Sequence, residues 1–148
     1  MQVSHADSRT HAIFDDEHVI GYAGLVPVMR LAERCGLDGL VGEHVAVTGP
    51  CGANAALKIG SMVAGMATGA DCIDDLCALR HGGMDKAFDG IRAPSTLGSF
   101  LRGLTWGNVR QIEKVHRGFL GRLAAHAPLL PGAGTLAFLD LDSMQRRV

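Results

Sequence analysis

The stretch Thr105–His126, TWGNVRQIEKVHRGFLGRLAAH, carries the strongest helical pattern in this chain of 148 residues. Six side chains in it recur at the three-and-four spacing of one helix face: Val109, Ile112, His116, Phe119, Leu120 and Leu123. Arg110, Lys114 and Arg117 lie on the opposite side, because each residue turns a helix by about 100°. The pattern predicts one long amphipathic helix over about 105–126 with a basic outer face.

Five shorter segments in front of it also have helical patterns. Pro27 suits a helix start, and an apolar stripe follows it and ends at Gly36. Glycines then interrupt the chain as far as about Gly52. The further helices are expected over about 53–69, from Asp71 to Gly82, over 84–89, and from a Ser95–Thr96 cap to about Leu101.

Two segments have the pattern of β-strands. Residues 11–24 predict a short hairpin around a polar turn, and residues 135–142 alternate with Asp140 and Asp142 on one face. The expected fold is therefore mainly α-helical, with an amino-terminal β-hairpin and one terminal strand. We divide the chain into a helical region, residues 1–134, and the start of a second domain, residues 135–148.

The composition favours a packed protein without a membrane anchor. Hydrophobic residues make up 47% of the chain and charged residues 20%, which is enough for a core. The amino terminus is polar and acidic, so no secretory signal is expected. Residues 53–70 consist mainly of small residues and carry Lys58, which argues against a membrane span, and Gly65-x-x-x-Gly69 indicates close packing of soluble helices. We expect a soluble, cytoplasmic protein.

The four cysteines, Cys35, Cys51, Cys72 and Cys77, have no Cys-x-x-Cys spacing. Cys77 and His81 lie four residues apart on an expected helix, but two ligands do not make a structural zinc site. We interpret the cysteines as small buried hydrophobic residues.

Charge is divided unevenly along the chain. Residues 1–89 hold six Lys or Arg against twelve Asp or Glu, a net charge of −6, whereas residues 90–126 hold six Lys or Arg against Glu113, a net charge of +5. A polyanion would therefore contact the second half.

Residues 94–102, PSTLGSFLR, lie between a short expected helix and the long basic one. This order is compatible with a helix-turn-helix whose second helix offers Ser95, Thr96, Ser99 and Arg102 to DNA. From spacing alone, a capped connector in a helical bundle is the more frequent case for such a segment. The basic face of 105–126 is likewise more often a solvated surface than a nucleic-acid contact.

Three stretches, GADCIDDLCALRHGGMDKAF, APSTLGSFLRGLTWGNVRQIEKV and LLPGAGTLAFLDLDS, follow one another in the second half of the chain. In this order they resemble the amino-terminal part of DDE-class insertion-sequence transposases of the 1380 group, and the likeness extends from about Phe14 to the end. The resemblance implies a helical DNA-binding and assembly region followed by the first strand of a ribonuclease-H-like catalytic domain.

It further implies DNA transposition, with binding of terminal inverted repeats, possible homodimers, nucleoid association, and Mg²⁺-dependent cleavage and strand transfer. Asp142 is the expected first catalytic carboxylate and metal ligand, with Asp140 as the alternative. The other two carboxylates are expected after Val148, so we expect a truncated transposase that holds no metal and cleaves no DNA by itself. A non-enzymatic helical DNA-binding regulator and a pseudogene product are the alternatives.

Overall fold

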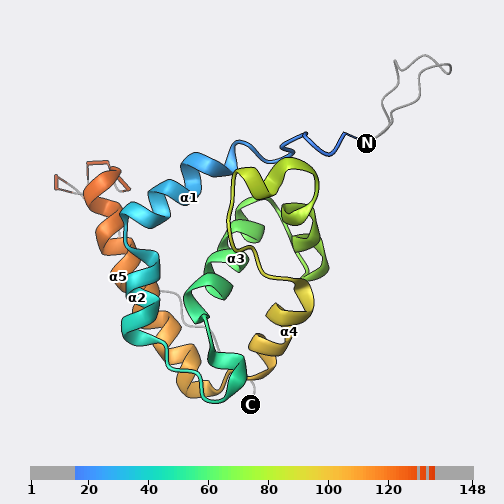
Figure 1. Cartoon of the computed structure of the whole chain (residues 1–148). Coiled ribbons are helices and arrows are strands. Elements are labelled where there is room, and N and C mark those ends of the chain that lie inside the picture. The colour runs from blue at the N-terminus through green and yellow to red at the C-terminus, as the bar shows by residue number, and fades with distance from the viewer. Residues whose placement is uncertain (1–15, 130, 133, 136–148) are drawn as a thin grey trace.

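The computed structural model describes residues 16–129, 131–132 and 134–135, and the only regular elements in them are helices. The α-helices are α1 (Leu25–Arg34), α2 (Leu37–His44), α3 (Ala55–Ala67), α4 (Pro94–Arg102) and α5 (Trp106–His126). The 3₁₀ helices are η1 (Pro50–Gly52), η2 (Asp74–Arg80) and η3 (Gly82–Lys86). Helix α3 runs through the middle, with α2 and α5 side by side on one side of it and α4 on the other (Figure 1). The mainly α-helical prediction is confirmed.

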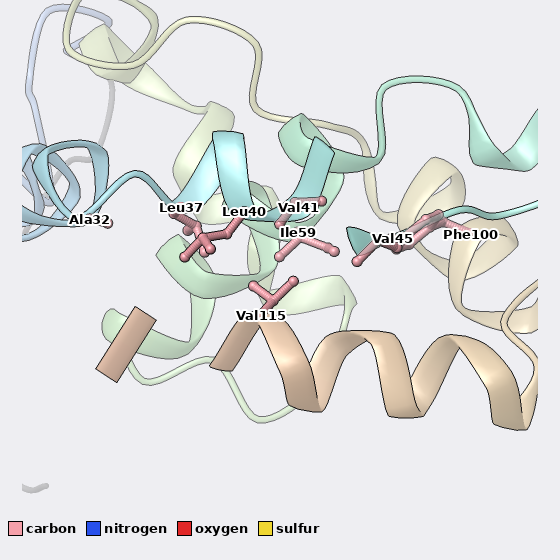
Figure 2. Close-up of a cluster of buried hydrophobic side chains, with 8 residues drawn as sticks. All are labelled: Ala32, Leu37, Leu40, Val41, Val45, Ile59, Phe100 and Val115. Carbon is pink, nitrogen blue, oxygen red and sulfur yellow. The ribbon is translucent and has the colours of Figure 1, made fainter. Parts of the chain in front are cut away.

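One hydrophobic cluster joins all five α-helices or their ends. Its buried members are Ala32, Leu37, Leu40, Val41, Val45, Ile59, Phe100 and Val115. Figure 2 shows Val115 directed from α5 toward Ile59 of α3 and the side chains of α2. Helices α2 and α5 approach closely at Gly118, where an added Cβ would lie 3.0 Å from Leu40. This cluster fixes the long basic helix against the rest of the protein.

A second, smaller cluster lies under the 3₁₀ helices. Leu25, Ala64, Leu79 and Met84 form it, with Met29, Phe88 and Ile91 packed at its edge. Gly65 of α3 allows η2 to approach, because a Cβ there would lie 2.6 Å from the Leu76 side chain. The close packing expected at Gly65-x-x-x-Gly69 is therefore present at Gly65, with η2 as the neighbour, and not at Gly69, where an added Cβ would meet nothing within 4 Å.

Helix α5 has the predicted limits but a rotated buried face. Thr105 and Asn108 form a capping box, and Asn108 Nδ2 also donates to Ala46 O at 2.7 Å. Asn108 and Val115 are buried, Ile112 and Phe119 are partly buried, and three of the predicted stripe residues are exposed: Val109, His116 and Leu120. The prediction was wrong for these three because the Asn108 bonds fix the angular position of the helix.

The predicted amino-terminal hairpin is not supported. Its expected first strand lies outside the described residues, and residues 18–24 of its second half contain turns at 18 and 21–24 and no strand. Asp16 Oδ1 accepts the His18 N–H at 2.8 Å, a local bond that favours a turn. Val19 and Tyr22 are exposed, so the segment has no buried face for an alternating strand to cover. The predicted terminal strand lies almost entirely outside the described residues.

Two helical segments also differ from the prediction. Helix α2 occupies the stretch expected to be irregular, and it is held by its buried Leu37, Leu40 and Val41 despite two interior glycines. The helix expected from Asp71 to Gly82 is the 3₁₀ helix η2, whose period of three buries Leu76 and Leu79 together. Cys77 falls off that face, and both Cys77 and Cys72 are exposed, so the prediction of buried cysteines was wrong for these two.

Across the described ranges, no helix is long and apolar enough to cross a membrane.

Candidate nucleic-acid interface

Helix α4 presents a polar face to solvent. Leu97, Gly98 and Phe100 are buried, which leaves Ser95, Thr96, Ser99 and Arg102 exposed along the opposite side. The residue at the N-cap position is Ala93, which supplies no side-chain cap, and Pro94 is the first helical residue. The predicted Ser95–Thr96 cap was therefore wrong by two residues.

The polar residues of α4 are connected along the helix. Ser99 Oγ donates to Ser95 O at 3.0 Å, and Arg102 Nη2 donates to Ser99 Oγ at 3.3 Å. The element before α4 is the five-residue 3₁₀ helix η3, followed by an irregular connection. A helix-turn-helix needs an α-helix at that place, so α4 is not the second helix of a regular one.

Helix α5 presents the predicted basic face. Arg110, Lys114 and Arg117 are all exposed, and Arg110 pairs with Glu113 at 3.2 Å. In the part of the chain that the structure describes, no carboxylate lies within 4.0 Å of the Lys114 or Arg117 nitrogens. Lys114 and Arg117 are therefore exposed and form no ion pair with the described residues.

The structure does not bring the two sets of predicted DNA-binding residues into one cluster. Helices α4 and α5 are joined through residues 103–105 and then separate, one on each side of α3 (Figure 1). Arg102 ends α4 beside this connection, whereas Ser95 and Thr96 lie in the first turn of α4. A single ligand that touches both sets must be extended, as a nucleic-acid backbone is.

Two other basic residues of the 90–126 segment make contacts within the protein. Arg122 Nη1 donates to the carbonyl oxygens of Cys35 and Gly36 at 3.3 and 3.4 Å, where α1 ends. Arg92 has its Nε buried, and its backbone N–H donates to Ser61 Oγ at 3.1 Å. Arg122 is nevertheless exposed, so the exposed basic residues of this segment are Arg102, Arg110, Lys114, Arg117 and Arg122, and Arg122 differs from the others in its bonds to the end of α1.

The expected catalytic residues Asp140 and Asp142 lie outside the described residues. Among the described residues, one group of ligand types comes together: Asp71, Cys72 and Asp75, with their ligand atoms within 4.8 Å of one another and all exposed. Asp75 Oδ2 already accepts the backbone N–H groups of Asp71 and Cys72, each at 3.2 Å. The Cys72 thiol and these N–H groups lower the pKa of the Asp75 carboxyl. Magnesium prefers an octahedral shell of oxygen atoms. Two exposed carboxylates, one of which already accepts two backbone hydrogen bonds, and a thiol do not supply that shell.

Lys58 was not assigned to a site from the sequence. It lies on α3, only 6% of its surface is exposed, and it lines an open hollow of about 600 Å³ beside Ser95, Thr96 and Ser99. The available signal was a single lysine in a helix otherwise made of small and apolar residues. That signal does not reveal which other segments lie beside the Lys58 side chain.

Comparisons with protein-family models, with curated proteins and with solved structures find no match to this chain.

Proposed function

We propose that this chain binds DNA as the amino-terminal region of a DDE transposase of the 1380 group and recognises the terminal inverted repeats of a mobile element. The resemblance in residue order supports the family. The observation that carries the DNA-binding part is the exposed basic face of α5, where no carboxylate of the described residues lies within 4.0 Å of the Lys114 or Arg117 nitrogens. Lysine and arginine on an extended face neutralise backbone phosphates and release counterions.

In this proposal α5 positions the protein on the DNA backbone, and the polar face of α4 provides further contacts. The full-length enzyme uses Asp142, or Asp140 in its place, as the first of three carboxylates that hold Mg²⁺. Two such ions activate the attacking oxygen and stabilise the leaving one, first in hydrolysis and then in attack by a 3′-hydroxyl. The protein acts at the nucleoid in the cytoplasm, and a homodimer would pair the two ends of the element.

The alternative is a DNA-binding regulator without catalysis. The observation that favours it is that the described residues already form a helical unit with its own core. Both functions use the same interface, and they differ in the DNA that is preferred. A transposase selects duplexes that carry the inverted repeats of an element, so competition between such a duplex and a scrambled one of equal length separates them.

The test measures binding of the 148-residue chain to labelled duplex DNA at several salt concentrations. Changing Arg110, Lys114 and Arg117 together to alanine should weaken binding and flatten the dependence of log Kobs on log salt by about 0.9 for each phosphate that is no longer neutralised. Trp106 provides a second signal, because it is the sole tryptophan, is 74% exposed and lies one turn before Arg110. Its fluorescence should change on binding.

The matched control changes three exposed cations elsewhere, Arg30, Arg34 and Lys86, to alanine. This variant loses the same net charge, so a general electrostatic effect would weaken both triple variants equally. The proposal requires that the α5 variant lose affinity and the control keep it. Equal losses, or no binding by the unchanged chain, would overturn the proposed interface.

A further inference from the structure

Lys58 carries a positive charge that the described part of the protein does not neutralise. Its Nζ donates one hydrogen bond, to Cys51 O at 2.7 Å, and lies 5.4 Å from the centre of the Phe100 ring. No carboxylate among the described residues lies within 4.0 Å of this nitrogen. An ammonium group has three donors, so one carbonyl leaves its hydrogen-bonding capacity incomplete.

Burial makes this arrangement costly. A charged side chain that leaves water is stable only when partners replace its hydration, and only 6% of the Lys58 surface remains exposed. A carbonyl oxygen and an aromatic ring offset part of that cost, but neither carries a negative charge. An anion from outside the chain would supply the missing partner.

The position of Lys58 gives an anion access to it. The side chain lines the open hollow with Pro50 and Cys51 of η1 on one side and Ser95, Thr96 and Ser99 of α4 on the other. Ser95 and Thr96 are exposed, so a ligand in the hollow can reach donors of α4 in addition to Lys58 of α3.

The start of α4 also favours an anion in this hollow. The first helical bond of α4 runs from Leu97 N to Ala93 O, so the N–H groups of Ser95 and Thr96 come before it. Ala93 provides no side-chain cap for them. Uncapped N–H groups at a helix start favour negative charge. Here they belong to residues that line the same hollow as Lys58, which has no carboxylate within 4.0 Å among the described residues.

We infer that this hollow, lined by Lys58, Ser95, Thr96 and Ser99, binds one phosphate group. Lys58 supplies the charge, and the hydroxyl and N–H groups of Ser95 and Thr96 supply hydrogen bonds to its oxygens. That the phosphate belongs to DNA rests on the function proposed above, whereas the site itself does not. If it does belong to DNA, the first turn of α4 positions the protein on the backbone and does not read bases.

The first experiment uses inorganic phosphate and no DNA. The ¹⁵N-labelled chain is titrated with sodium phosphate against sodium chloride at equal pH and ionic strength, and amide shifts are followed. The Ser95 and Thr96 amides should shift with saturation in phosphate only. Lys58→Met, which removes the charge and keeps an unbranched side chain, should abolish the shifts, and Lys86→Met, at an exposed lysine elsewhere, should leave them unchanged.

A second variant keeps the inference falsifiable if Lys58→Met does not fold. Thr96→Asp places a carboxylate in the first turn of α4 at an exposed position, where the helix dipole favours it. It should raise the unfolding temperature and prevent phosphate binding, because the carboxylate occupies the region that the phosphate needs. Saturating phosphate shifts that persist in Thr96→Asp, or that occur away from α4 and η1 in the unchanged chain, would overturn the site.

The DNA arm identifies the source of the phosphate. If a backbone phosphate occupies the hollow, Lys58→Met should weaken duplex binding and reduce the salt slope by about 0.9, the value for one neutralised phosphate. The opposite result is that the chain binds inorganic phosphate while Lys58→Met leaves the salt slope of DNA binding unchanged. That result would refute the DNA assignment and identify a site for free phosphate groups. If the unchanged chain binds no duplex, the proposed function is refuted. The evidence for a phosphate site from the inorganic-phosphate titration then still holds.

Discussion

The acidic segment, residues 70–91, and the basic segment, residues 94–126, differ in both charge and backbone. The acidic segment holds five Asp against Arg80 and Lys86, a net charge of −3, and folds as the 3₁₀ helices η2 and η3. The basic segment holds five Lys or Arg against Glu113, a net charge of +4, and folds as α4 and α5. Electrostatic attraction therefore favours contact between a polyanion and the basic segment, whereas the acidic segment repels a polyanion.

The two segments also contribute differently to the core. In the basic segment Phe100 and Val115 belong to the larger cluster, which involves every α-helix. In the acidic segment Leu79 and Met84 belong to the smaller cluster, which rests on α3 and the start of α1. A 3₁₀ helix repeats every three residues and is seldom long, so it buries few side chains. We therefore expect the basic segment to be the more stable of the two.

The largest expected effect tests this difference directly. Phe100→Ala should lower the free energy of unfolding by about 3–5 kcal/mol, because it leaves a cavity in the larger cluster. Urea titration followed by far-ultraviolet circular dichroism measures it. Leu101→Ala is the matched control, since Leu101 is 38% exposed on the same helix and should cost much less.

Leu79→Ala provides the other half of the comparison. It should increase hydrogen exchange in residues 70–91 before it does so in α5, because its cavity lies in the smaller cluster. Equal exchange in both segments, or a Phe100→Ala variant as stable as Leu101→Ala, would show that the two clusters form one cooperative unit.

A smaller effect separates the basic residues that support the fold from those proposed to bind DNA. Arg122→Ala should cost about 1 kcal/mol, because it removes the bonds to the carbonyls of Cys35 and Gly36, and should leave DNA binding unchanged. Arg117→Ala, at an exposed position earlier on the same helix, should change stability by no more than about 0.5 kcal/mol and weaken DNA binding. Urea titration and duplex binding measured on both variants give the answer. The distinction fails if both variants change the same property.

The long helix was predictable from the sequence, whereas the face that it buries was not. Its limits follow from the capping residue Thr105 and from periodicity, which are local properties. Its rotation depends on Asn108, which donates to Ala46, a residue 62 positions away. The apolar side chains of α5 occupy more than one face of the helix. Periodicity alone therefore predicted a buried stripe that is rotated about the helix axis from the face that is buried in the structure.

Helix α2 and Lys58 were missed for a related reason. Two glycines lower the helical propensity of α2, and its packing against α3 and α5 compensates for them. Lys58 is buried, and it lines its hollow together with residues of η1 and α4, an arrangement between segments that are distant in the sequence. The outward basic residues of α5 were easier to place, because an exposed face opposite an apolar one follows from the helical period.

The smallest expected effect concerns Asp75 in the acidic segment. Its carboxyl accepts hydrogen bonds from the Cys72 side chain and from the backbone of Cys72 and Asp71, and these lower its pKa below the ordinary value of 3.8. A carboxylate whose pKa is lowered in the folded state stabilises that state at pH values above its unfolded pKa. The stabilisation is lost as the pH falls through the lowered folded value.

Asp75→Asn should therefore destabilise the protein slightly at pH 7, and its difference from the unchanged chain should shrink below about pH 4. Because Asp75 is exposed, solvent screens the interaction and the effect should be smaller than that of Arg122→Ala. Urea midpoints measured from pH 7 to pH 3 follow it, with Asp74→Asn as the control at an exposed neighbouring carboxylate. If Asp74→Asn shows the same loss with the same pH dependence, general repulsion in the acidic segment determines its stability, and the local bonds of Asp75 do not. If only Asp75→Asn shows it, the turn at residues 71–75 is held by a charged hydrogen-bond acceptor, which would explain why a segment with so few buried side chains keeps a defined backbone.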